Sequence, residues 1–215
     1  MEFVLESGMF RILAVVIGYF LGNIQTSYLF GKLFKNTDIR KHGSGNPGTA
    51  NTIRTFGLSV GAIVFIVDVL KAVTAFLLCM YLFGGSFFDG YNGLLPGMYA
   101  GVGVVLGHNF PFFMRFRGGK GIASSIGVML CTDWRIVVIQ TALGLSCLFT
   151  TRMISIVSLA LTLVFPVLML VFRFDIEAVL ISVFLTALAW IMHRGNIKRI
   201  LTGSERKLSF GKSRG

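Results

Sequence analysis

Four short polar segments, each lying between apolar stretches, hold the residues best suited to chemistry. The first, residues 42–54, contains Ser44, Gly45, Asn46 and Arg54. Its three glycines let the backbone turn freely, and its N–H groups and hydroxyls suit an oxyanion. A flexible turn is the plain alternative, but basic side chains stand on both sides of the glycines. We therefore predict a phosphate site here.

The second segment, residues 107–121, brings Gly118, Gly119 and Lys120 directly before a short apolar stretch. A helix N-terminus, a nest of glycine N–H groups and a lysine could converge there on an anion. The nucleotide-binding pattern Gly-x4-Gly-Lys-Ser/Thr is excluded, because Met114 replaces its first glycine and no hydroxyl follows Lys120. The alternative is a basic loop that only sets membrane orientation.

The third and fourth segments carry fewer signals. The third contains Ser155 beside a single arginine, and alone it is typical of a helix boundary. The fourth begins at His193 and ends at Glu205. If the fourth segment is helical, His193 and Asn196 share a face at i, i+3. A lone histidine is usually structural, but one beside an asparagine at the end of a membrane helix is equally a site candidate.

A pair of opposite charges, Asp68 and Lys71, stands inside an apolar stretch at i, i+3. Each charge at a membrane helix centre costs about 2.5–3.5 kcal/mol on insertion scales, so the two should pair or face a polar interior. A structural ion pair and a buried end of the active site both remain open at this point.

Several motifs of common enzymes are missing from the sequence. It contains no His-x4-Asp, Gly-x-Ser-x-Gly or His-Glu-x-x-His pattern and no carboxylate cluster. We therefore exclude serine hydrolases, zinc peptidases and two-metal phosphotransferases, and we predict no metal and no cofactor. The cysteines have neither metal spacing nor Cys-x-x-Cys pairing and are interpreted as packing residues: Cys79, Cys131 and Cys147.

The elements that must position these segments are membrane helices. The 215 residues are 54% hydrophobic and 13% charged, with a mean hydropathy of +0.79, which predicts one all-α integral membrane domain over residues 1–215. The net charge of +11 falls in short loops, so it indicates membrane orientation and not nucleic acid binding. The apolar stretches are residues 9–34, 57–83, 94–112, 121–132, 134–150, 153–172 and 177–193.

The distribution of charge decides how often the chain crosses the membrane. Sixteen of the 20 Lys and Arg residues lie in the loops that contain the four polar segments or in the tail after residue 193, whereas acidic residues mark the other ends: Glu2, Glu6, Asp89, Asp133, Asp175 and Glu177. Placing every basic loop on the cytoplasmic side requires seven transmembrane helices, with the N-terminus outside and the C-terminus cytoplasmic. A single helix over 121–150 would put Arg152 outside. Because 121–132 covers only about 18 Å of a roughly 30 Å core, a five-crossing model in which it merely dips in is the alternative.

With these segments assembled, the chain resembles the bacterial acyl-phosphate:glycerol-3-phosphate acyltransferases, the PlsY family, from end to end. The matching stretches are residues 22–28, 43–54, 68–71, 107–108 with 116–121, 152–155 and 193–205. The family usually has serine and proline where Asn23 and Gln25 stand, lysine at Arg117, the middle pair of 48–51 in the reverse order, and glutamate at Gly195. We therefore assign no role to Asn23 and no base to Gly195.

The resemblance implies a seven-helix fold whose active site faces the cytoplasm from a bacterial inner membrane. It implies transfer of a fatty acyl group from acyl phosphate to the 1-hydroxyl of glycerol 3-phosphate, giving 1-acylglycerol 3-phosphate (lysophosphatidic acid), with membrane lipid as the surroundings and no nucleic acid partner. By matching position, the acyl phosphate would be held by Ser44, Gly45 and Asn46 together with Gly118, Gly119 and Lys120. Glycerol 3-phosphate would be held by Arg54, Lys120, Ser155, His193 and Asn196, with Glu205 bracing the basic groups.

Two other functions stay open on the sequence alone. A transporter or channel for organic phosphates would also use basic glycine loops and charges within the membrane, but it predicts polar loops on both faces and often an inverted repeat. A non-catalytic assembly subunit would leave the four polar segments without an explanation. The sequence predicts no oligomeric state.

Overall fold

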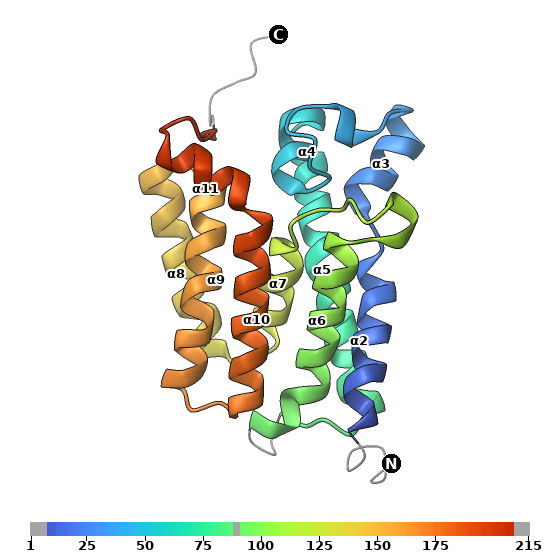
Figure 1. Cartoon of the computed structure of the whole chain (residues 1–215), viewed down its shortest axis with the longest axis vertical. Helices are drawn as coiled ribbons and strands as arrows, with labels where there is room; N and C mark the ends of the chain where they lie inside the picture. The colour runs from blue at the N-terminus through green and yellow to red at the C-terminus, as the bar shows by residue number, and fades with distance from the viewer. Residues whose placement is uncertain (1–7, 88–90, 209–215) are drawn as a thin grey trace.

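The computed structural model describes residues 8–87 and 91–208, and in that part the chain is entirely helical, as predicted (Figure 1). The helices are α2 (Met9–Gly22), α3 (Thr26–Lys35), α4 (Thr49–Phe56), α5 (Leu58–Leu82), α6 (Leu95–Asn109), α7 (Ile122–Leu130), α8 (Trp134–Thr151), α9 (Ile154–Val171), α10 (Ile176–Met192) and α11 (Arg194–Leu201). Short 3-10 turns are η1 (Ile39–Lys41), η2 (Tyr91–Leu94) and η3 (Phe112–Met114).

The apolar stretches all become helices, with one change from the expected pattern. The stretch 9–34 is broken at residues 23–25 into α2 and α3. Residues 121–132 and 134–150 form two separate helices as expected, so the alternative of a single long helix over 121–150 is wrong. Within residues 8–87 and 91–208, four spans are long and apolar enough to cross a bilayer, namely Met9–Lys35, α5, α8 and α9. A fifth arises if α10 and α11, which meet at a bend of 62°, count as one. The nine-residue α7 extends only about 13 Å, and seven crossings remain a prediction.

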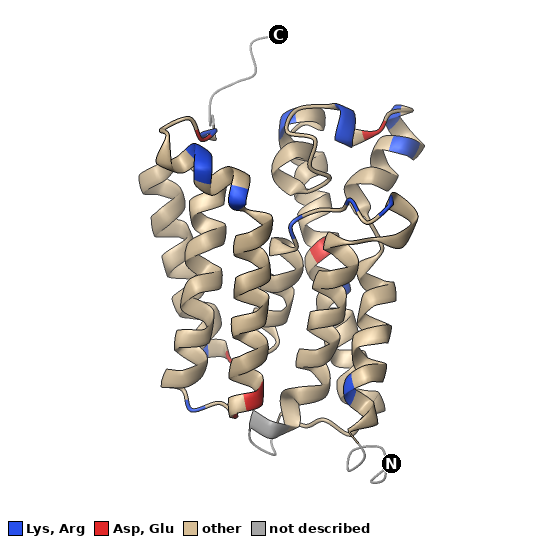
Figure 2. Ribbon diagram, viewed as in Figure 1, with Lys and Arg blue, Asp and Glu red and all other residues tan. Residues whose placement is uncertain are grey.

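The charged side chains divide between the two ends of the bundle. Figure 2 shows most of the Lys and Arg residues at the end that carries α3, α4 and α11. The turn between α8 and α9 lies there too, because the Leu208 N–H donates to the Arg152 carbonyl at 2.7 Å. At the other end, Arg11 pairs with Glu177 at 2.6 Å. Three acidic residues of the charge argument lie outside the described residues: Glu2, Glu6 and Asp89.

Helices α2 and α6 pack backbone against backbone through glycines. A side chain at Gly18 or Gly22 of α2 would collide with main-chain atoms of α6, and one at Gly103 or Gly107 of α6 would collide with α2. Small residues at such contacts let membrane helices approach closely, which compensates for the weak hydrophobic drive between helices in lipid. This contact fixes the C-terminal end of α6, where the second polar segment begins.

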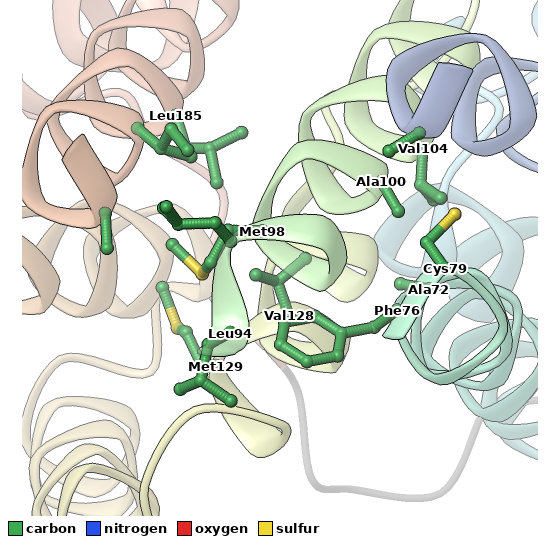
Figure 3. Packing of buried hydrophobic residues seen from close by; sticks show 14 of the residues in the cluster. Ala72, Phe76, Cys79, Leu94, Met98, Ala100, Val104, Val128, Met129 and Leu185 are labelled. Atoms are coloured by element: carbon green, nitrogen blue, oxygen red, sulfur yellow. The ribbon is translucent and has the colours of Figure 1, made fainter. Parts of the chain in front are cut away.

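The bundle has two halves, α2, α5 and α6 on one side and α8, α9 and α10 on the other, with α7 between them (Figure 1). Figure 3 shows Phe76 of α5 beside Val128 of α7, and Met98 of α6 facing Leu185 of α10. Helix α8 lies at the periphery of the bundle, since only Ile136 and Gln140 of its residues are buried. A cavity lies between α5, α7, α8 and α9.

Candidate active site

A cavity of about 890 Å³ extends from the basic end of the bundle into its apolar interior. Its wall contains residues that are far apart in the sequence and come from all four polar segments. Nine of the eleven predicted site residues line it: Ser44, Gly45, Asn46, Arg54, Lys120, Ser155, His193, Asn196 and Glu205. The fold therefore assembles one site from loops that the sequence analysis treated separately.

The predicted glycine nest is not formed by Gly118 and Gly119. Their N–H groups donate to the carbonyls of Asn109 and His108, each at 3.0 Å, and neither residue lines the cavity. The two glycines instead hold the extended segment before Lys120 against the end of α6. Glycine is needed at 119, because a side chain there would meet the His108 imidazole. Their contribution is the placement of Lys120.

The first polar segment is shaped by Asn51, a fully buried residue that the sequence analysis passed over. The Asn51 Oδ1 accepts from the Ser44 N–H at 2.7 Å, and its Nδ2 donates to the carbonyls of Ile39 and His42. Gly43 and Gly45 both adopt positive φ, which the tight turn requires. Helix α4 begins within this segment, ahead of the apolar stretch 57–83, so Arg54 lies on a helix.

The N-termini of α4, α7 and α9 face the cavity, and none of these has a side-chain cap. The first-turn residues of α4, α7 and α9 all belong to the wall: Thr49, Ala50, Ile122, Ala123, Ile154 and Ser155. The first turns of helices leave N–H groups unpaired and carry partial positive charge, so each terminus favours an anion. The sequence analysis predicted this feature for α7 alone.

Glu205 organises the side of the site built from α9 and α11. Its Oε1 accepts from Ser155 Oγ at 2.9 Å and from Asn196 Nδ2 at 2.8 Å, and its Oε2 accepts from Arg199 Nε at 2.7 Å. Burial raises the pKa of this carboxyl, but the hydrogen bonds from Asn196, Ser155 and Arg199 outweigh burial and hold the pKa below its usual range. Glu205 is therefore ionised at neutral pH.

The cavity carries a surplus of positive charge. Five Lys and Arg side chains and two carboxylates line it. Burial, reinforced by the positive charges of Arg199 and Arg54, lowers the pKa of Lys120 to about 8. Burial and the neighbouring Arg206 likewise lower the pKa of Arg54. Crowded, desolvated cations of this kind favour an anionic ligand, which would relieve their mutual repulsion.

His193 lies at the bend between α10 and α11. The fourth segment is therefore helical from Arg194 on, but it does not continue α10 in a straight line. Its Nδ1 lies 2.7 Å from the Ala189 carbonyl, which can only accept, so this nitrogen carries the proton. The other ring nitrogen, Nε2, is then an acceptor in the neutral imidazole. Asn196, one turn on, accepts from the Lys120 ammonium through Oδ1, which links the two halves of the site.

The deeper part of the cavity is mostly apolar, with Gln140, Thr141 and Ser158 as polar exceptions. Helices α5, α7, α8 and α9 contribute its wall, which includes Phe65, Ile126, Leu145, Leu148 and Leu161. Lining residues on α8 extend from Leu148 to Val137, about 16 Å along the helix axis. A slot of this length and polarity suits an alkyl chain whose polar head lies among the basic residues.

Two further polar residues line the cavity, Asp68 of α5 and His108 of α6. Asp68 pairs with Lys71 at 2.8 Å, so the ion pair expected from the sequence is present and lies beside the site. Within the described residues, no three His, Cys, Asp or Glu side chains come together as metal ligands.

A family model described as glycerol-3-phosphate acyltransferase matches residues 12–203. The chain belongs to the glycerol-3-phosphate acyltransferase family. A glycerol-3-phosphate acyltransferase of Thermoanaerobacter sp. (strain X514) is 40% identical over 200 residues, covering 93% of this chain and 96% of that protein. One of Clostridioides difficile (strain 630) is 39% identical over 197 residues, covering 92% and 95%.

Solved structures of the acyltransferase PlsY (YgiH) share the fold. Its glycerol 3-phosphate form superposes with a TM-score of 0.83 at 31% identity, covering 93% of this chain and 96% of that one. Its lysophosphatidic acid form gives a TM-score of 0.80 at 29% identity. The resemblance drawn from the sequence is thus confirmed: the protein is an integral membrane acyltransferase of phospholipid synthesis.

Two departures from the acyltransferase pattern lie in the break between α2 and α3, and both fit there. The Asn23 Oδ1 accepts from the Phe112 N–H at 3.0 Å, and the Gln25 Nε2 donates to the His108 carbonyl at 2.9 Å. Both side chains are buried, so they take part in joining α2 to the loop after α6.

Proposed function

We propose that the protein transfers a fatty acyl group from an acyl phosphate to the 1-hydroxyl of glycerol 3-phosphate, giving 1-acylglycerol 3-phosphate. The observation that supports this most strongly is the two-part cavity, with a cationic mouth and an apolar slot in one continuous space. An acyl phosphate has the same two parts, and glycerol 3-phosphate is a second phosphate of small size. The surplus of cations suits two phosphates better than one.

The two phosphates are assigned to different parts of the mouth. Ser44, Gly45 and Asn46, with the N-termini of α4 and α7, face the acyl phosphate. Arg54 and Lys120 bind the phosphate of glycerol 3-phosphate through charge-assisted hydrogen bonds. Gly118 and Gly119 act here only by placing Lys120, because their N–H groups are occupied.

On the other side of the mouth, Ser155, His193 and Asn196 orient the glycerol. Ser155 and Asn196 are fixed by their bonds to Glu205, which keeps their side chains in one arrangement. The acceptor nitrogen of His193 receives a hydrogen bond from the 1-hydroxyl. An alcohol held in this way is presented to the acyl carbon without further loss of entropy.

In the reaction, the 1-hydroxyl oxygen of glycerol 3-phosphate forms a bond to the acyl carbon, and the bond from that carbon to the phosphate oxygen breaks. The products are the ester and inorganic phosphate, and the hydroxyl proton passes to a phosphate oxygen of the substrates. Because a mixed anhydride has a good leaving group, positioning and charge stabilisation supply most of the rate. His193 thus orients the hydroxyl and does not abstract its proton.

The basic end of the bundle is assigned to the cytoplasmic side of a bacterial inner membrane. The four polar segments lie at that end, which agrees with the enrichment of Lys and Arg in cytoplasmic loops (Figure 2). In this orientation the mouth of the cavity receives soluble glycerol 3-phosphate from the cytoplasm, while the apolar slot lies at the depth of the lipid tails.

The test is an assay of the purified protein in detergent with glycerol 3-phosphate and either palmitoyl phosphate or a palmitoyl thioester. We expect lysophosphatidic acid and an equal amount of inorganic phosphate from palmitoyl phosphate, and at least tenfold less product from the thioester. Glycerol serves as the control acceptor without phosphate. Efficient use of the thioester would contradict the donor assignment. Uptake of glycerol 3-phosphate into proteoliposomes without any acyl transfer would favour the transporter alternative.

A further inference from the structure

Three ionisable side chains are buried together between α5 and α6, and none has been given a role so far. Asp68, Lys71 and His108, here called the Asp68 cluster, are 1%, 6% and 3% exposed. The Lys71 Nζ lies 2.8 Å from the Asp68 Oδ1 and 2.9 Å from the His108 Nδ1. Burying an ion pair is costly and often gives no net stability compared with apolar residues. Net stability therefore does not explain why these three charged or polar side chains are buried together.

Lys71 fixes the break between α2 and α3. Its ammonium group donates to the carbonyl of Gly22 at 3.2 Å and to that of Ile24 at 2.7 Å. The end of a helix leaves carbonyl groups without partners, which is unfavourable inside a membrane. Thr26, the first residue of α3, donates to Asp68 at 3.2 Å. The cluster thus holds both sides of the break.

His108 connects the cluster to the loop segment that carries Lys120. Its carbonyl accepts from the Gly119 N–H at 3.0 Å, and its imidazole lies directly under Gly119, where a side chain would collide with it. Gln25 donates to the same carbonyl, so the His108 carbonyl holds both the break between α2 and α3 and the segment before Lys120. The residue just before Lys120 therefore rests on His108.

Asp68 connects the cluster to the other side of Lys120. The Ser124 hydroxyl, in the first turn of α7, donates to the Asp68 carbonyl at 3.3 Å. The chain is therefore anchored on both sides of Lys120. Gly119, one residue before it, bonds to His108, and Ser124, four residues after it, bonds to Asp68. Both anchoring residues also line the cavity that Lys120 enters.

We propose that the Asp68 cluster is a positioning device for Lys120, which sets the place of the ammonium group in the phosphate site. The inference rests on the proposed function, because it takes Lys120 as a phosphate ligand. It predicts that changes in the cluster act on acyl transfer through Lys120. A cluster that only stabilises the fold would reduce the amount of active protein regardless of which residue stands at position 120.

The experiment is a double-mutant cycle on kcat/KM for glycerol 3-phosphate. His108→Ala is made in the wild-type chain and in Lys120→Ala. A misplacement of a catalytic group by about 1 Å lowers the rate on the order of 100-fold. We therefore expect His108→Ala to lower kcat/KM by that order in the wild-type background. In the Lys120→Ala background, the same change should cost less than about threefold.

Ser124→Ala provides a second cycle that does not depend on His108→Ala folding. It removes one buried hydroxyl without leaving a charge unpaired, and we expect a loss of about tenfold, again only when Lys120 is present. Ser182→Ala is the matched control. Ser182 is equally buried, but its hydroxyl donates within α10 to Val179, so kcat/KM should stay at the wild-type value.

Equal fold losses in both backgrounds, or no loss in either cycle, would overturn the positioning role. Failure of the proposed function looks different, because the wild-type protein would then show no acyl transfer. A Lys120→Ala variant with wild-type kcat/KM would overturn the positioning role and the assignment of Lys120 together, even if acyl transfer itself is observed.

Discussion

The Lys120 ammonium loses its charge within the range of an ordinary pH profile. Burial and the neighbouring arginines lower its pKa to about 8. A lysine is charged below its pKa, and only the charged form binds phosphate well, so kcat/KM should be nearly full at pH 7 and fall as the pH rises through 8. The charged fraction falls from about 90% at pH 7 to about 10% at pH 9. We therefore expect a loss of about tenfold across this range.

The assay is initial-rate kinetics with palmitoyl phosphate in excess and glycerol 3-phosphate varied, corrected at each pH for hydrolysis of the donor. The phosphate of the acceptor has its second pKa near roughly 6, so it does not titrate in this range. Lys120→Arg is the matched variant, because a guanidinium stays charged throughout and should flatten the profile. A wild-type profile flat to pH 10, or an unchanged fall in Lys120→Arg, would refute the reasoning.

Four further outcomes are expected. Arg54→Ala should cost about 2 kcal/mol or more in transition-state stabilisation, measured as kcat/KM; near-normal turnover would make Arg54 merely topogenic. Glu205→Gln weakens three hydrogen bonds, so it should lower the free energy of unfolding and the transition-state stabilisation by about 1–3 kcal/mol, measured as a lower melting temperature and a lower kcat/KM; a change in neither would contradict its bracing role. His193→Asn should retain far more activity than His193→Ala, with the acidic limb of the profile preserved; loss of activity and of that limb in both would identify a general base. In a chain without its native cysteines, a cysteine replacing Asp89 should react with an impermeant reagent in intact cells, whereas one replacing Arg152 should not; labelling at 152 would rule out seven crossings.

The sequence predicts the helices and most of the site because both depend on strong local signals. Membrane helices require long apolar runs, and the cost of burying charge confines Arg54, Lys120 and Glu205 to the ends of those runs. Nine predicted residues therefore meet in one cavity. What could not be predicted depends on the geometry of the backbone. Whether the N–H groups of Gly118 and Gly119 face a ligand or α6 is decided by how the loop packs.

The break between α2 and α3 shows the same limit. Residues 9–34 are mostly apolar, and although glycine and asparagine, as at Gly22 and Asn23, commonly end helices, this local signal alone does not predict the break. The break is stabilised by Lys71, almost fifty residues away, whose ammonium group takes up the carbonyls that the break leaves open. Asn51 was passed over for a related reason, since an asparagine in a glycine-rich loop has no local feature that distinguishes an anchor from a solvated turn.

The site is divided between the two halves of the bundle. Ser44, Arg54 and Lys120 belong to one half and its loops, whereas Ser155 and His193 belong to the other. The close glycine contact of α2 and α6 lies within one half. A change in the spacing of the two halves would therefore move Ser155 and His193 relative to Arg54 and Lys120, and so separate the groups that hold the two ends of the acceptor, while each half keeps its own packing.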